Sequence, residues 1–422
     1  SREWLTLPGA VIFDVPPLAF PDLEHLPEQG ALLDFAAVQL FVERCQSIVP
    51  DFRLTAENAP AIARICTLLD GIPLALELAA AALSTLSVQE IAARLDARFL
   101  LSSPGYRTAD ARHHTLNDTV AWSYHLLSPP ERRFLAHLAV FVGGWTLDAL
   151  EATWQDAADC VLLLRQLVQK SLVRVEHNPT SMDDRTRYHL LRAVRDYAMA
   201  RLSEDADEDS VRRCHFTYYA RLASGLGSEV FGSRHLYAMA RLDADYHNIR
   251  AAFRYAADKP DLADACVCAA SELSYYWLLR SYTLQAEGIS WLQVGLKNES
   301  LLTASTRART YAALLNLHGA DPFHFRLNTD HVGGPQLPAM IDSLVETSLA
   351  QGDAQAAARL MLAAVNVSPD ASVFPEAGDY AQRAWAILAA SDDQRGMGFA
   401  RNALIWTHLV QGDLTAAQAL QA

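Results

Sequence analysis

Most of the chain has apolar residues that recur every three or four positions, the period of amphipathic α-helices that bury one face. In the first hundred residues this period begins at Val38, Phe41 and Cys45, and it predicts a helix that ends near Pro50. From Leu32 onward the chain is therefore expected to be mainly helical.

Turn and capping residues divide the next stretch into three more helices. Thr55 is expected to cap the second helix, which ends at Gly71, because glycine accepts the backbone conformation that closes a helix. Pro73 fits the first turn of the third helix, where a missing N–H costs nothing. Residues 87–90, Ser-Val-Gln-Glu, form a capping box for the fourth.

The segment from 128 to 202 changes its period partway along. Residues 128–131, Ser-Pro-Pro-Glu, predict a helix start, and shorter helices follow Thr146 and cover residues 162–168. Residues 171–175 and 187–190 then read as two strands joined by a polar loop. Three helices followed by a hairpin is the order of a winged helix, and a further helix is expected over 192–202.

An acidic run at 203–209 is interpreted as a solvated boundary, and only helical patterns follow it. Gly378-Asp379 and Gly412-Asp413 are 34 residues apart, the period of a tetratricopeptide helix pair, and each is expected to open an Ala-rich helix. Residues 351–353, Gln-Gly-Asp, are expected to open a similar helix. The Gly/Pro-rich stretch 319–338 interrupts the array, whose last repeat is expected to be incomplete.

Charge and composition narrow the function. The net charge is −14, and only three of the 35 basic residues are lysines, so overall binding to nucleic acid is not expected. The six cysteines form no CxxC pair, which fits free buried thiols in a reducing cytoplasm. Neither a membrane span nor a signal peptide is visible, and the first residue is Ser rather than Met.

Motifs for catalysis are missing from the sequence. It has no GxxxxGK[ST] loop to hold phosphates, no apolar run ending in a Walker-B carboxylate, and no HExxH, GxSxG or GxGxxG motif. His113, His114 and His324 lack partners at metal-ligand spacing. We therefore expect no metal site, no catalytic residue and no enzymatic activity in this chain by itself.

Four segments in order resemble the signal-transduction ATPases with numerous domains, the NB-ARC-type bacterial regulators. They are residues 1–18 with Ser1-Arg2-Glu3, the helical-lid segment 69–79 with Gly71-Ile72-Pro73, the segment 122–145, and the segment 170–198 with Tyr188-His189-Leu190. The resemblance covers residues 1–255 well and extends beyond them only as generic helical repeats.

The resemblance implies a mainly α architecture of five parts. These are a β remnant of the nucleotide-binding core at 1–20, a helical lid and linker at 21–112, a winged helix at 113–202, a helical linker domain at 203–300, and an incomplete α-solenoid of tetratricopeptide-like repeats at 301–422. The short apolar strand 11–15 would belong to the first part.

Three residues take roles through this resemblance. Arg2 matches the sensor arginine that reads the terminal phosphate, Pro73 the proline that packs on adenine, and His189 the histidine that holds the β-phosphate of ADP. Leu190 replaces the aspartate that follows this histidine in the family. The residues alone fit equally an arginine near a terminus, a helix N1 proline and a core histidine.

The resemblance implies the regulatory and sensor part of an ATP/ADP-switched signalling or transcriptional regulator. ADP or ATP with Mg would bind only together with a P-loop core, and the intact protein would be a slow ATPase switch that can self-associate on activation. The repeats would bind a protein partner or a small inducer. The alternatives are a stand-alone protein-binding scaffold and a winged-helix DNA-binding regulator. Glu151, Asp156 and Asp159 near Arg165 disfavour the latter.

Overall fold

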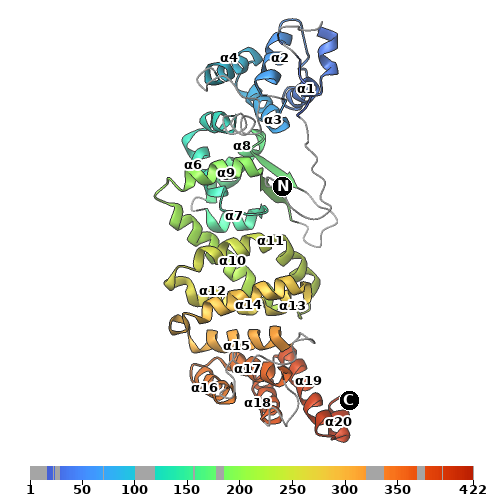
Figure 1. Cartoon of the computed structure of the whole chain (residues 1–422), viewed down its shortest axis with the longest axis vertical. Coiled ribbons are helices and arrows are strands. Elements are labelled where there is room, and N and C mark those ends of the chain that lie inside the picture. Colours follow the sequence, from blue (N-terminus) through green and yellow to red (C-terminus); the bar gives the residue numbers. More distant parts are fainter. Residues whose placement is uncertain are drawn as a thin grey trace, which may run out of the picture. The chain divides into compact units, whose positions relative to one another are not determined.

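A computed structural model describes residues 17–21, 23, 29–69, 71–99, 119–154, 157–176, 185–319, 337–367, 376–391 and 393–421. Arg2, the expected strand 11–15 and most of the stretch 319–338 lie outside these ranges, as do His113, His114 and His324. The described part is mainly helical, with one small sheet, which confirms the predicted fold class (Figure 1).

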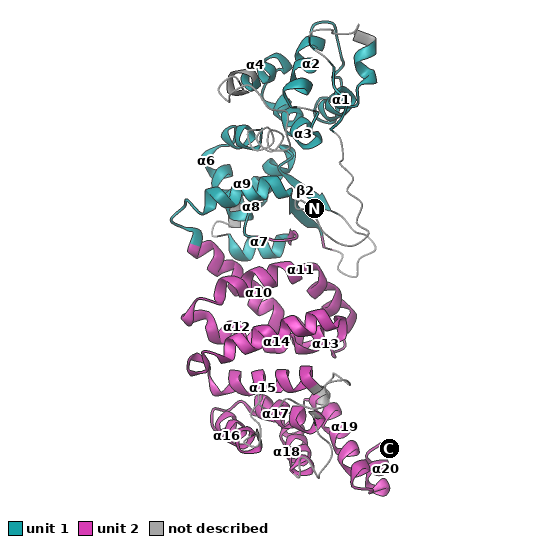
Figure 2. Cartoon of the chain, in the orientation of Figure 1, with its two compact units in different colours: residues 1–140, 146–176, 186–208 teal, residues 141–145, 177–185, 209–422 magenta. Residues whose placement is uncertain are grey.

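The chain forms two compact units (Figure 2). Unit 1 comprises residues 1–140, 146–176 and 186–208. Unit 2 comprises residues 141–145, 177–185 and 209–422, so it takes in two short segments from within the sequence of unit 1. The chain passes from unit 1 to unit 2 for the last time between Glu208 and Asp209, within the acidic run that was predicted as a boundary. The five-part division of the chain stays a prediction.

Unit 1 begins with a four-helix group around one apolar core. Phe41, Ile62, Leu76 and Leu95 are all buried in it. Its helices are η1 (Gln29–Asp34), α1 (Ala36–Ile48), α2 (Ala59–Leu68), α3 (Pro73–Ala81), η2 (Ala82–Ser84) and α4 (Val88–Phe99). The four predicted helices are thus confirmed as elements.

A local capping signal marks the start of α4 but not that of α2. Ser87 and Glu90 bond reciprocally at the start of α4, as the capping box requires. Thr55, however, does not cap α2, so that prediction is wrong. Thr55 and Asn58 bond to each other in a turn, and the helix begins only at Ala59. The apolar pattern could not separate this turn from the helix.

The second half of unit 1 has the winged-helix order of elements. They are α6 (Pro129–Leu138), β1 (Trp145–Thr146), α7 (Leu147–Thr153), α8 (Ala157–Gln169), β2 (Val173–Glu176), β3 (Arg187–Leu190) and α9 (Arg192–Leu202). The sheet has the order β1-β3-β2, and β2 pairs antiparallel with β3, with Arg174 opposite His189.

The capping box of α6 is also present, with both Ser128–Glu131 bonds formed. Strand β2 begins two residues later than expected, because Ser171 has a φ of 56° in the turn that follows α8. The two-residue strand β1 was not predicted, since two residues are too few to show an alternating pattern.

Unit 2 is a succession of helices. They are α10 (Glu208–Ser228), α11 (His235–Ala256), η3 (Pro260–Leu262), α12 (Ala263–Glu272), α13 (Ser274–Arg280), α14 (Tyr282–Leu296), η4 (Glu299–Leu301), α15 (Ala304–Gly319), α16 (Leu337–Ala350), α17 (Ala354–Val367), α18 (Ala377–Ala390), α19 (Gln394–Val410) and α20 (Leu414–Gln421). From α15 to α20 each helix packs on the next, in the manner of a helical array.

The repeated feature of this array is a turn, and it differs from the predicted one. Gly352 and Gly412 have φ values of 82° and 80°, and each follows a helix. Asp353 and Asp413 then accept the backbone N–H of Ala356 and of Ala416, both at 3.0 Å. The expected helix opening at 351–353 is therefore confirmed.

Gly378-Asp379 opens the Ala-rich helix α18, as predicted, but it does not form such a turn and so is not equivalent to Gly412-Asp413. The dipeptide lies inside the first turn of α18, whose cap is Glu376. Asp393 instead occupies the equivalent position before α19, where it accepts the N–H of Gly396 at 2.8 Å. The shared dipeptide at 378 and 412 stands at two different helix positions.

Candidate functional site

Pro73 lies at the N1 position of α3 with its ring exposed, as a residue that receives a ligand ring must be. The preceding Gly71 has a φ of 60°, and a Cβ there would lie 2.1 Å from the carbonyl oxygen of Leu18. Leu18 donates its N–H to the Gly71 carbonyl at 3.0 Å. The glycine is thus required to hold residues 17–20 against the start of this helix.

His189 lies in the middle of β3, where its Nε2 is 2.9 Å from Glu176 Oε2 on β2. Partial burial lowers the pKa of His189, although the Glu176 carboxylate acts in the opposite direction. The imidazole is therefore mostly neutral at neutral pH and already has an acidic neighbour. A phosphate approaching this ring would have to compete with Glu176.

An ion pair joins the elements that carry Pro73 and His189. Glu77, one turn after Pro73 on α3, contacts Arg44 at 3.2 Å and Arg174 at 3.4 Å. Arg174 is the cross-strand partner of His189. The helix start and the hairpin therefore belong to one face of unit 1. Arg2, the third predicted residue, lies outside the described residues.

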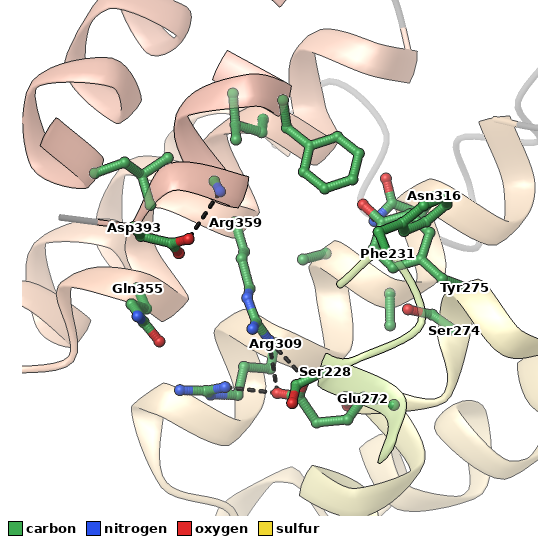
Figure 3. A pocket seen from close by; sticks show the side chains of 18 of the residues that line it. Ser228, Phe231, Glu272, Ser274, Tyr275, Arg309, Asn316, Gln355, Arg359 and Asp393 are labelled. Atoms are coloured by element: carbon green, nitrogen blue, oxygen red, sulfur yellow. Dashed lines mark hydrogen bonds and ion pairs between the residues drawn. The ribbon is translucent and has the colours of Figure 1, made fainter. Parts of the chain in front are cut away.

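Unit 2 contains a cavity of about 410 Å³ that sequence reasoning did not predict. Its walls come from the end of α10, from α12 and α13, and from α15, α17, α18 and α19 (Figure 3). This volume lies within the range of pockets that hold small organic ligands. Both polar and aromatic side chains line it.

One wall of the cavity carries a network of ion pairs centred on Glu272, whose side chain is 8 % exposed. Arg309 Nη1 lies 2.6 Å from Glu272 Oε1, and Arg359 Nη1 lies 2.7 Å from both carboxylate oxygens. Arg309 Nη2 also pairs with Asp353 at 2.8 Å. The network thus ties α12, α15 and the start of α17 together.

A second part of the wall is made of three aromatic rings. Tyr275 and Phe399 are nearly parallel, with centroids 5.8 Å apart. Phe231 stands edge-on to both, at 4.9 and 5.5 Å, and 41 % of its surface is exposed. Asn316 donates to the Tyr275 hydroxyl at 3.2 Å and so fixes the orientation of that ring.

No group of three or more His, Cys, Asp or Glu side chains that could hold a metal ion occurs among the residues that the structure describes. Within the same residues, no helix is both long enough and apolar enough to cross a membrane.

Comparison with known proteins places the chain beside mycobacterial proteins. It is 32 % identical over 397 residues to a protein of Mycobacterium tuberculosis H37Rv and to one of Mycobacterium bovis, both named "Putative HTH-type transcriptional regulator". The match covers 90 % of this chain, which spans only 42 % of the length of these relatives. A further M. tuberculosis protein with no functional name is 39 % identical over 216 residues, covering 50 % of this chain and 51 % of its own length.

No family model matches the chain. Among solved structures, a signal-transduction ATPase with numerous domains and a tetratricopeptide repeat sensor from Pyrococcus horikoshii aligns with 91 % of this chain and 58 % of its own. The sequence identity is 11 % and the TM-score is 0.38, which is too low to establish a shared fold.

Proposed function

We propose that this chain is the regulatory and sensor part of a nucleotide-switched transcriptional or signalling regulator. The observation that carries the proposal is the unit 2 cavity, because aromatic rings and fixed polar groups that converge on one pocket are the usual features of a small-ligand site. The similarity to mycobacterial proteins named as transcriptional regulators supports the regulatory role.

In this proposal, ADP or ATP binds at the α3–hairpin face only together with a P-loop core that these residues do not supply. The exposed ring of Pro73 is suited to pack on adenine, and His189 to face the β-phosphate. Arg2 would contact the terminal phosphate, since a guanidinium is permanently charged and forks onto phosphate. A ligand that binds two states unequally would then shift the balance between them.

The chain alone is expected to hydrolyse no ATP. Nucleotide content and turnover test this part of the proposal. The native protein purified from its source cell should release ADP on denaturation. The 422-residue chain incubated with Mg-ATP should release phosphate only at the background rate. Magnesium-dependent release by the chain that survives repurification would overturn the proposal.

Variants at the α3–hairpin face sharpen the test. In the native protein, His189→Ala should reduce the affinity for ADP by about tenfold, the loss expected of one hydrogen bond to a charged group. His125→Ala, an exposed histidine of the same unit, should leave the affinity unchanged. A nucleotide-free native protein, or equal affinities in the two variants, would favour a protein-binding scaffold instead.

DNA binding by the winged helix is the weaker alternative. The exposed side chains of α8 include Asp159, Val161, Leu162 and Arg165, of which only one is basic. A helix that enters the major groove needs basic and polar groups toward phosphates and bases. Salt-dependent retention on duplex DNA that is lost in Arg165→Glu would favour this alternative.

A further inference from the structure

The unit 2 cavity offers one defined cationic edge. Toward the described residues, Arg359 forms its ion pair through Nη1 alone, and Glu272 holds the guanidinium in place. The Nε and Nη2 atoms make up the other edge of the planar group. Two parallel N–H donors on such an edge match the two oxygens of a carboxylate.

The charges of the network limit the ligand to a single negative group. Arg309 and Arg359 are balanced by Glu272 and Asp353, and Arg309 is bonded on both sides. Asp393, which lines the cavity and accepts the N–H of Gly396, adds a third carboxylate, so the described residues leave no surplus of positive charge for a multiply charged ligand. Only Arg359, with 38 % of its side chain exposed, can turn a donor edge to the cavity. A polyphosphate would need several uncompensated cations, so one carboxylate fits better.

The three aromatic rings line the same cavity as Arg359. Tyr275 and Arg359 line the same cavity, and the positive charge of Arg359 opposes the rise in the pKa of Tyr275 that burial causes. Figure 3 shows Arg359 reaching toward Glu272, and Phe231, Tyr275 and Asn316 gathered in a separate group to the right. A flat ring can lie against the exposed Phe231 while its substituent meets the guanidinium.

We infer that this cavity binds a small planar aromatic carboxylate, with its ring against Phe231, Tyr275 and Phe399 and its carboxylate on Arg359. The inference rests on the proposed function, because it names the chemical class of the inducer that the helical repeats sense. The cavity volume of about 410 Å³ is large enough for one or two fused rings.

Calorimetric titration of the 422-residue chain with indole-3-acetate, phenylacetate and benzoate tests the inference. At least one of these acids should bind, and indole-3-acetamide should bind at least about tenfold more weakly than indole-3-acetate, because an amide lacks the charge that strengthens bonds to arginine. Cyclohexanecarboxylate should also bind more weakly than benzoate, since it has the charge but no flat ring.

Two substitutions locate the site. Arg359→Met keeps the apolar stem and leaves Glu272 paired with Arg309, and it should weaken binding of the acid about tenfold or more. Arg401→Met on the exposed surface of α19 is the matched control and should change nothing. Phe399→Leu should reduce the preference for benzoate over cyclohexanecarboxylate.

The inference is overturned if none of the acids binds, if acid and amide bind equally, or if Arg359→Met binds like the wild type. Should Arg359→Met fail to fold, as judged by circular dichroism, the acid–amide and ring comparisons on the wild-type chain still decide. None of these titrations contains nucleotide. A negative result would therefore reject the carboxylate site without bearing on the proposed nucleotide switch, which the nucleotide experiments test separately.

Discussion

Arg309 and Asp353 form an ion pair of 2.8 Å that links the middle of α15 to the cap of α17. Asp353 also accepts the N–H of Ala356 at 3.0 Å and the hydroxyl of Ser305. Burial acts to raise the pKa of Asp353, but these bonds outweigh it and lower the pKa to about 2. One carboxylate therefore serves as a helix cap and as an anchor for the cavity wall.

The first prediction concerns acid stability. The folded-state pKa of Asp353 lies below the unfolded value of about 3.9, so its contribution is present above pH 4 and is lost as pH falls toward 2. Asp353→Asn should lower the free energy of unfolding at pH 7 by about 2 kcal/mol, with a smaller difference near pH 2. Denaturant unfolding of unit 2 at several pH values measures this.

Asp413→Asn is the matched control, because Asp413 caps α20 in the same turn geometry and is more than half exposed. It should cost no more than about 0.5 kcal/mol, because asparagine caps a helix about as well as aspartate does. An equal loss in both variants would mean that the Arg309 ion pair adds no stability.

The second prediction concerns His137 in α6, which is 4 % exposed. The Thr153 hydroxyl donates its proton to the Leu150 carbonyl at 3.1 Å. In its contact with His137, Thr153 Oγ1 can therefore only accept, and the His137 Nε2–H donates to it at 3.0 Å. Burial lowers the pKa of His137 to about 4. The ring is thus neutral in the folded chain.

Because the unfolded chain takes up this proton near pH 6.5, the stability of unit 1 should fall as pH drops from 6.5 to 4. His137→Gln should flatten the pH profile in that window. An imidazole titration of His137 by NMR with a midpoint near 6.5 would contradict the prediction.

The third prediction compares two glycines of α10. A Cβ on Gly227 would lie 2.4 Å from the carbonyl oxygen of Glu272, whereas a Cβ on Gly225 would meet nothing within 4 Å. Gly227→Ala should therefore destabilise unit 2 by about 1–3 kcal/mol, because it forces α10 and α12 apart. Gly225→Ala should stabilise it by up to about 1 kcal/mol, the difference in helix propensity. Thermal unfolding distinguishes the two, and a shift of equal sign would contradict the contact.

The fourth prediction concerns Asn248, which is fully buried on α11. It accepts the N–H of Val142 at 2.6 Å and donates to the carbonyl of Gly144 at 2.8 Å. Asn248→Ala should cost about 2–3 kcal/mol, because buried backbone groups lose their partners. The exposed Asn402→Ala should be neutral in the same denaturant titration. A neutral Asn248→Ala would mean that water replaces the amide.

Local sequence signals predicted what depends on neighbouring residues. The Ser-to-Glu spacing gave the starts of α4 and α6, and the change of period gave the hairpin and α9. The cavity could not be predicted in this way. Glu272 lies 37 residues from Arg309 and 87 from Arg359, and only the packing of three helices brings these charges together.

The predicted nucleotide-site residues illustrate the same limit. The proline position of Pro73 in α3 followed from local rules and is confirmed. That Glu176 pairs with His189, and that Glu77 joins α3 to Arg174, depends on strand register and on helix–strand packing. These pairings join residues that are far apart in the sequence. Periodicity and capping signals involve only neighbouring residues, so they cannot predict such contacts.

Unit 2 is built from separate segments of the sequence, and this has a practical consequence for the design of truncated variants. A fragment that starts at Asp209 would lack Phe141–Trp145, the segment whose backbone Asn248 holds and whose Phe141 ring meets His215 at 5.5 Å. The apolar and aromatic surface that residues 141–145 cover would then be exposed to solvent. We expect such a fragment to aggregate. Adding residues 141–145 as a separate peptide would test directly whether the fragment can bind this segment again and become soluble.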